Sequence, residues 1–289
     1  MRDNKSRLIT VWVPGNHGAG GSTIANAVGI ALQHFTDKKT LIVNYGGPQS
    51  YMERYLEKDV DMRFSMDYLK SFDDSINAEH IKTYATPINE MLYIIPNSKI
   101  SRDISKVGED FNQRFLDEAK KVFDFIIIDI ESGINIEKQV FLDKADIILA
   151  VMTSNEIMLD DLHGSNSDNT IRSFLGDMKT LSVFNLLDPG ENVEKELKYL
   201  NKKYRLKGSF GITYDNKAYK ACCVDKKFYS FMKKHLSMKK CDTTLPDQIK
   251  ELCGIITERL YMPMEEQVET HGFINMLLSK AKHWGEFDA

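Results

Sequence analysis

The sequence predicts an α/β domain with a doubly wound, mostly parallel sheet flanked by helices. Short runs of apolar and β-branched residues alternate with longer amphipathic stretches along the 289-residue chain. The runs are apolar at consecutive positions, a pattern typical of strands that helices cover on both faces. Strand, helix, strand order implies parallel pairing with right-handed crossovers. A composition of 42% hydrophobic and 28% charged residues is that of a globular chain.

Seven segments carry the strand pattern, and the clearest is Phe123 to Asp129, which is apolar on both faces. The other six are Leu8 to Val13, Thr40 to Asn44, Met91 to Ile95, Ile147 to Thr153, Thr180 to Leu186 and Gly208 to Thr213. Residues 51–90 are charged and irregular in pattern, which favours helical insertions over one edge of the sheet. We therefore expect one domain over residues 1–262 and a separate tail over 263–289.

Two helices can be placed from local signals. One is expected from Ser22 to Phe35, directly after a glycine-rich loop. The other is expected from Leu245 to Leu260, with Pro246 in its first turn, where proline lacks a hydrogen bond to lose. In the tail, residues 272–284 form an amphipathic segment with an aromatic-rich apolar face. That segment could pack on its own domain, which we favour, or contact a membrane interface or a partner helix.

Charge and cysteine content favour a cytoplasmic protein. The net charge is -4, which argues against a chain that coats nucleic acid over its whole surface. A local basic stretch from Lys226 to Lys240 leaves nucleic acid as a less favoured partner. The four cysteines include no C-x-x-C pair, which fits a reducing compartment. The N-terminus has no apolar run long enough for a signal peptide followed by a cleavage site.

The loop after the first strand predicts a phosphate-binding site. It runs from Pro14 to Thr23 and leads into the first helix. Glycines let successive backbone N–H groups point at an anion, and the helix N-terminus adds partial positive charge. The ordinary phosphate loop is G-x-x-x-x-G-K-S/T. Gly15 and Gly20 hold its spacing and Ser22 its hydroxyl, but Gly21 occupies the lysine position.

These residues resemble the loop of the MinD/ParA family, SIMIBI-class P-loop proteins with a deviant Walker A motif. That family's loop reads G-K-G-G-x-G-K-T-T, and residues 15–23 align with it. The resemblance covers Gly15, Gly18, Gly20 and the hydroxyls, but Asn16 and Gly21 stand at the two lysine positions. His17 lies between them, and we interpret it as a solvated loop residue.

Further family landmarks follow in order. Asp129 resembles the acidic end of the Walker B strand, where it would either bind magnesium through water or cap the strand. Asn185 resembles an asparagine that reads adenine. Asn44 and Gly46 lie near the positions of the family's acidic segment. The segment Gly211 to Asp215, which reads G-I-T-Y-D, resembles the family's G-x-I-P-Y-D turn, and Asp215 is expected to order it.

The resemblance implies a site for ATP or ADP with Mg²⁺, held weakly or absent, and it assigns no catalytic residue. Nucleotide contacts are implied for Gly15, Gly18, Gly20, Gly21, Ser22, Thr23, Asp129 and Asn185. Metal contacts are implied for Ser22 and Asp129. Without the lysines we expect an ATPase-like fold whose hydrolysis is lost or very slow, because phosphoryl transfer depends on such charges.

The loop is most similar to the TadZ/CpaE-like branch, which implies a localisation or assembly factor for a pilus, secretion or conjugation apparatus. That role implies a homodimer, protein partners in a membrane-associated apparatus, and recruitment to the inner face of the membrane or a cell pole. The alternative is an active ParA-type ATPase in plasmid or chromosome partitioning, with a lysine supplied from elsewhere.

Overall fold

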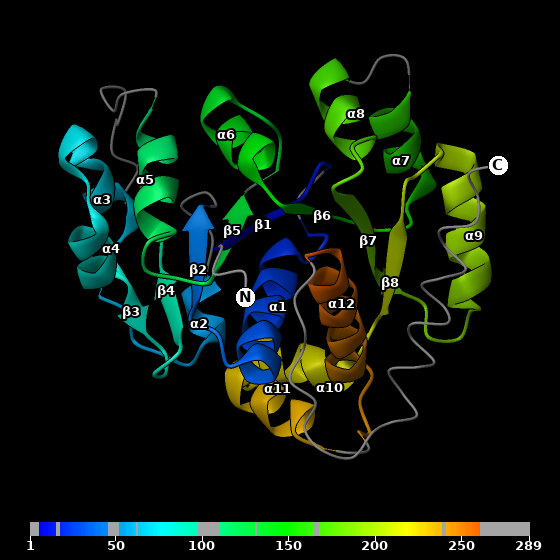
Figure 1. Cartoon of the computed structure of the whole chain (residues 1–289). Helices are drawn as coiled ribbons and strands as arrows, with labels where there is room; N and C mark the ends of the chain where they lie inside the picture. Colours follow the sequence, from blue (N-terminus) through cyan, green and yellow to red (C-terminus); the bar gives the residue numbers. More distant parts are fainter. Residues whose placement is uncertain are drawn as a thin grey trace.

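The computed structural model describes residues 6–15, 18–45, 52–61, 63–97, 110–130, 132–164, 168–238 and 241–260. Within these residues one eight-stranded sheet has the order β3-β4-β2-β5-β1-β6-β7-β8. The pairs are parallel except β3 with β4, which is antiparallel. The predicted fold class, a mostly parallel sheet flanked by helices, is therefore confirmed (Figure 1).

All seven predicted strands are present, with ends that shift by one or two residues. The strands are β1 (Arg7–Trp12), β2 (Thr40–Tyr45), β3 (Thr86–Pro87), β4 (Leu92–Ile95), β5 (Phe125–Ile130), β6 (Ile147–Met152), β7 (Thr180–Leu187) and β8 (Ser209–Thr213). The strand that the sequence pattern does not predict is β3, which pairs only at Thr86 and Pro87. Its place at the sheet edge suits a proline, which has no N–H to donate to a neighbour.

Helices cover both faces of the sheet. The helical segments are α1 (Gly21–Thr36), α2 (Met52–Tyr55), α3 (Met66–Lys70), a 3-10 turn η1 (Asp73–Ser75), α4 (Ala78–Tyr84), α5 (Phe111–Ala119), α6 (Ile136–Lys144), α7 (Glu156–His163), α8 (Asn169–Leu175), α9 (Val193–Tyr204), α10 (Asn216–Tyr219), a π-helix η2 (Lys220–Val224), α11 (Phe228–Leu236) and α12 (Leu245–Arg259). In Figure 1, α1, α2, α10, α11 and α12 lie below the sheet and α5 to α8 above it.

Each layer encloses its own hydrophobic core. One core joins α1, α11 and α12 to the sheet through residues such as Ile24, Met232 and Ile256. The other joins α5 to α9 to the opposite face, with Phe115 and Phe141 fully buried. The strand β5 contributes side chains to both cores, which explains why its sequence is apolar at consecutive positions.

The region 51–90 forms short helical elements near the β3-β4 edge, as the sequence predicts. The tail 263–289, with its amphipathic segment 272–284, lies outside the described residues, so its placement stays a prediction. Within the described part of the chain, no helix is both long enough and apolar enough to cross a membrane.

Candidate functional site

The loop between β1 and α1 reaches the helix through two glycines with left-handed backbones. Gly18 has φ 98° and Gly20 has φ 87°, a region that residues with a Cβ rarely adopt. Asn16 and His17 lie outside the described residues. Gly20 is the N-cap of α1, and it has no side chain with which to cap the helix.

The N-terminus of α1 lacks a side-chain cap, whereas six other described helices have one. Their N-cap side chains accept hydrogen bonds from first-turn N–H groups, and these residues are Asn77, Asn135, Asn155, Asp168, Asn192 and Asp215. The first turn of α1 also contains no acidic residue. The helices α3, α5, α11 and α12 also lack a side-chain cap. At α1 the bare N–H groups and partial positive charge follow a glycine-rich loop, and an anion such as phosphate suits them.

Ser22 and Asp129 meet at the base of this loop. The Ser22 hydroxyl, in the first turn of α1, donates to Asp129 Oδ2 at 2.6 Å. Asp129 lies on β5 and is only 4% exposed. The pairing register places Asn44 of β2 beside it. The predicted metal pair is thus brought into direct contact by the packing of α1 on the sheet.

Both groups have the chemistry that Mg²⁺ prefers, because a hydroxyl and a carboxylate are hard oxygen donors. Mg²⁺ binds such oxygens at about 2.0–2.1 Å and usually keeps several water molecules. Ser22 could ligate the ion directly and Asp129 through one of those waters. The donor set fits the ion, and the assignment of Ser22 and Asp129 as metal ligands stays a prediction.

Gly21 packs so closely that a side chain there would require a neighbour to move. A Cβ built on Gly21 would lie 2.6 Å from Val13 Cγ2 and 3.7 Å from Asp129 Oδ1. Contacts below about 3 Å force a neighbour to move, and Val13 is a buried residue with a stiff branched side chain. The position where the resemblance expects lysine is therefore shaped around a glycine.

Asn185 contacts the loop directly. Its Nδ2 donates to the carbonyl of Ala19 at 2.8 Å. A Cβ on Gly20 would lie 2.4 Å from that same nitrogen, so the contact requires glycine there. The pairing of β7 with β8 is irregular after Phe184, and Leu186 has φ 63°. Asn185 thus anchors the loop between β1 and α1 through Ala19. Its role in contacting adenine stays a prediction.

Three contacts around the loop have no counterpart in the sequence pattern. A Cβ on Gly15 would meet Met158 Sδ of α7 at 2.7 Å, so α7 covers the start of the loop. Behind it, Thr23 and Tyr55 both lie close to the buried side chain of Cys222. Burial, followed by the neighbouring Cys223, raises the pKa of Cys222 to about 12, so its thiol is protonated at neutral pH. No local sequence signal pairs these residues, because they come from distant elements.

A second polar network lies beyond the end of β2. Tyr45 donates from its hydroxyl to Glu137 Oε2 at 3.1 Å and accepts from Asn112 Nδ2 at 3.2 Å. Burial raises the pKa of the Tyr45 phenol, which stays neutral. Lys138, on α6, donates from Nζ to the carbonyl of Ser132 at 3.2 Å, just past β5. Lys138 is therefore one described cation near the carboxyl edge of the sheet.

Comparisons with known proteins support the fold. No family model matches the chain, and no curated protein matches it. Solved structures do match. A ParA family ATPase from Chlorobium tepidum superposes with a TM-score of 0.66 and 17% identity, over 87% of this chain and 98% of that one.

Two further similar structures contain nucleotide. A variant of Cyanothece McdA in complex with ATP has a TM-score of 0.64 and 16% identity, over 91% of this chain and 100% of that one. The septum site-determining protein MinD from Pyrococcus horikoshii with Mg-ADP has a TM-score of 0.59 and 16% identity, over 86% and 98%. The chain thus has the ParA/MinD P-loop fold.

Proposed function

We propose that this protein is a ParA/MinD-like scaffold that binds ATP or ADP with Mg²⁺ weakly and hydrolyses ATP very slowly or not at all. As a homodimer it would help to localise or assemble a pilus, secretion or conjugation apparatus, at the inner face of the membrane or a cell pole. The observation that carries the proposal is the close packing of Gly21 against Val13, because a lysine at position 21 would force that buried side chain to move.

The loop keeps the groups that bind phosphate and lacks those that accelerate its transfer. Backbone N–H groups at the N-terminus of α1, together with Ser22 and Asp129, can hold a magnesium nucleotide. Phosphoryl transfer depends on positioned positive charge. Removing one preorganised donor typically costs about 10²–10³ in rate, so loss of the lysines at positions 16 and 21 affects turnover more than binding.

The choice of apparatus rests on the resemblance to TadZ/CpaE-like proteins, which commonly carry a residue other than lysine before the Ser-Thr pair. Gly21 is that residue here. The nucleotide ligands of similar structures, ATP in McdA and Mg-ADP in MinD, add support for a nucleotide in this loop. The division of the chain into a domain over 1–262 and a tail over 263–289 is part of the proposal.

The test measures binding and turnover on the same full-length protein. Isothermal titration with Mg-ATP and Mg-ADP is expected to show saturable binding, and hydrolysis is expected to be at least about 100-fold slower than that of a lysine-bearing ParA assayed beside it. Ser22→Ala should weaken the Mg²⁺ dependence of binding. The matched control is Ser173→Ala, at an exposed serine on α8.

Two results would contradict the proposal separately. ATP turnover at the rate of the lysine-bearing ParA would contradict the proposal that this protein is a scaffold with little or no hydrolysis. If neither nucleotide shows saturable binding, the proposal that the protein binds ATP or ADP is wrong.

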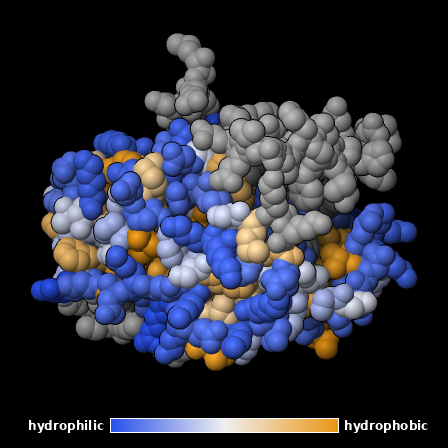
Figure 2. All heavy atoms as spheres, turned by 90° about the horizontal axis from the view of Figure 1, so that it is seen from below, coloured by the Kyte–Doolittle hydropathy of each residue, from blue (hydrophilic) through white to orange (hydrophobic). Residues whose placement is uncertain are grey.

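The second candidate function is an active ParA-type partition ATPase, and the basic surface of α11 favours it. Lys233 and Lys234 are exposed on α11, and Lys226 and Lys227 are exposed directly before it. Figure 2 shows that the face seen from below is largely hydrophilic where its residues are described. DNA retention that requires ATP and falls steeply with salt would support this function. Lys138→Met should then abolish turnover, if that lysine replaces the missing one.

A further inference from the structure

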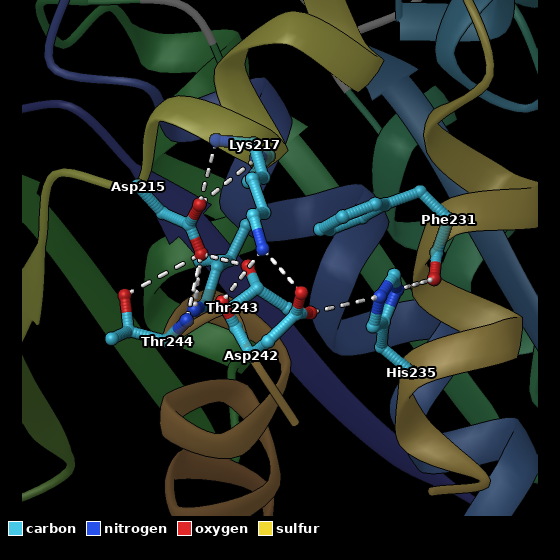
Figure 3. A network of polar contacts seen from close by, with 9 residues as sticks. Asp215, Lys217, Phe231, His235, Asp242, Thr243 and Thr244 are labelled. Atoms are coloured by element: carbon cyan, nitrogen blue, oxygen red, sulfur yellow. Dashed lines mark hydrogen bonds and ion pairs between the residues drawn. The ribbon is translucent and has the colours of Figure 1, made fainter. Parts of the chain in front are cut away.

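Three side chains with metal-binding chemistry converge where α11 leads towards α12, away from the phosphate loop. They are His235, Cys241 and Asp242, and one ligand atom from each lies within 4.8 Å of the other two. His235 Nε2 is 3.8 Å from Asp242 Oδ1. Figure 3 shows His235 and Asp242 facing each other across this space.

The histidine ring is oriented for a metal. Its Nδ1 lies 2.8 Å from the carbonyl oxygen of Phe231, an atom that can only accept a hydrogen bond. Nδ1 therefore carries the proton, and Nε2 presents its lone pair towards Asp242 and Cys241. The same arrangement, with one ring nitrogen bound to a backbone carbonyl, orients histidine ligands in metal sites. The Phe231 ring also contacts the imidazole, with 4.4 Å between the ring centroids.

The loop that carries the other two ligands is anchored directly after them. Asp215 Oδ2 accepts hydrogen bonds from the backbone N–H of Thr244 at 2.8 Å and of Leu245 at 2.9 Å. The hydroxyl of Thr243 donates to the same oxygen (Figure 3). Lys217 pairs with Asp242 through Oδ2, which leaves Oδ1 directed at the histidine. These contacts position Asp242 before any metal arrives, which lowers the ordering cost of binding.

The donor set and spacing fit Zn²⁺. In tetrahedral zinc sites the ion lies about 2.0–2.3 Å from nitrogen, oxygen and sulfur ligands, so ligand atoms are separated by roughly 3.3–3.8 Å. The observed separations need to close by about 1.5 Å at most. A thiolate and a carboxylate supply two negative charges to balance the ion. The mixture of nitrogen, sulfur and oxygen ligands disfavours Mg²⁺ and Ca²⁺, which prefer oxygen alone.

We propose that His235 Nε2, Cys241 Sγ and Asp242 Oδ1 form a Zn²⁺ site that joins α11 to the segment leading into α12. Binding releases the Cys241 thiol proton to solvent, and the ion forms its bond to the thiolate. Three protein ligands leave the fourth tetrahedral position open to water or to a side chain of a partner. Asp242 is exposed, so that position faces solvent.

The test uses the full-length protein stripped with a chelator and then titrated with Zn²⁺, with Co²⁺ as a spectroscopic substitute. We expect one ion per chain and a thiolate-to-cobalt charge-transfer band. Cys241→Ser should remove that band and weaken Zn²⁺ binding at least about tenfold, since even outer-sphere partners contribute that much. His235→Gln and Asp242→Asn should weaken binding similarly. The control is Cys223→Ser, at an exposed free cysteine outside the cluster.

Thermal unfolding of each metal-free variant checks that it folds. Cys241 is partly exposed, so Cys241→Ser is the variant least dependent on core packing. Zn²⁺ should raise the melting temperature of the wild type and of Cys223→Ser but not of Cys241→Ser. Equal Zn²⁺ affinity in the wild type and Cys241→Ser, or no saturable binding by the wild type, would overturn the proposal.

Discussion

At the scale of single residues, Gly20 is fixed by both its backbone and its neighbour. Its φ is 87°, and a Cβ would lie 2.4 Å from Asn185 Nδ2. Gly20→Ala is expected to lower the free energy of unfolding by roughly 1–3 kcal/mol, because it combines left-handed strain with loss of the contact to Asn185. Urea denaturation measures the loss.

Gly18→Ala is the matched comparison for this variant. Gly18 has φ 98°, but a Cβ at this position would meet nothing within 4 Å. It should therefore show the cost of strain alone, and a smaller loss than Gly20→Ala. Equal losses in the two variants would mean that the hydrogen bond from Asn185 to Ala19 contributes nothing to stability.

The missing lysine can be introduced experimentally by the substitution Gly21→Lys. Gly21→Lys alone is expected to destabilise the protein by about 1–3 kcal/mol, because its Cβ overlaps Val13 Cγ2. Adding Val13→Ala should relieve the overlap. If the loop is a phosphate site that lacks only its positive charge, the double variant should hydrolyse ATP roughly 100-fold faster than the wild type.

Val13→Ala alone is the control for that experiment, since it removes buried methyl groups without adding charge. Single-turnover hydrolysis and urea denaturation of all three variants separate catalysis from folding. A stably folded double variant with wild-type turnover would mean that a lysine at position 21 does not restore catalysis.

At the scale of elements, alanine substitutions at two glycines inside helices are expected to change the free energy of unfolding in opposite directions. Among the described residues, a Cβ on Gly254 of α12 meets nothing within 4 Å, whereas one on Gly29 of α1 would lie 2.6 Å from Ile42 Cδ1 of β2. Gly254→Ala should raise the free energy of unfolding by about 0.5–1 kcal/mol through helix propensity. Gly29→Ala should lower it by about 1–3 kcal/mol, because α1 packs closely on the sheet.

Thermal or urea unfolding of both variants checks the pair. Stabilisation by Gly29→Ala would show that α1 does not need the close approach to β2. Destabilisation by Gly254→Ala would show that α12 has a neighbour on that face.

The same elements show which parts of the fold a single sequence can predict. The strand β5 is predictable because a strand buried on both faces must be apolar at every position. Likewise α1 is predictable because its start is marked by glycines. The two-residue strand β3 is not, because its pairing with β4 depends on tertiary placement and not on local pattern.

Prediction of the site follows a similar division. The loop glycines and Ser22 carry a local spacing, and the structure brings Ser22 to Asp129 although they are 107 residues apart. The contact of Asn185 with Ala19 and that of Thr23 with Cys222 have no such spacing. They arise from the packing of distant elements, so only the structure could reveal them.

At the scale of the whole molecule, strand order places the loop at the centre of the sheet. On one side of β1 lie β5, β2, β4 and β3, and on the other lie β6, β7 and β8. Parallel sheets bind ligands beyond the carboxyl ends of strands where the strand order reverses. The loop after β1, Asp129 from β5 and Asn185 from β7 converge there. The topology therefore supports the same site as the loop geometry.

Global stability should depend on two partly buried histidines. Burial lowers the pKa of His163 at the end of α7, and burial together with Lys233 and Lys250 lowers that of His34 on α1. An unfolded chain then binds more protons than the folded one once the pH falls below about 6.5. Their contribution to stability is complete above that pH and is lost as the pH falls towards the folded pKa values.

Asp215 causes a further loss of stability at lower pH. Burial alone would raise the pKa of its carboxyl, but the N–H of Leu245, the Thr243 hydroxyl and other donors lower it overall. The stability contributed by Asp215 is therefore present above about pH 4, the ordinary value for an unfolded aspartate, and is lost as the pH falls further. Acid should thus destabilise the protein in two separate ranges.

Urea midpoints measured from pH 8 to pH 3 test this expectation. The midpoint should be level above about pH 7, fall once the pH drops below about 6.5 as the histidines charge on unfolding, and fall again below about pH 4. The double variant His34→Gln/His163→Gln should lose the first step and keep the second, because Asp215 is unchanged. A first step of equal size in the double variant and the wild type would show that other groups cause it, and that these two imidazoles are not held neutral by burial.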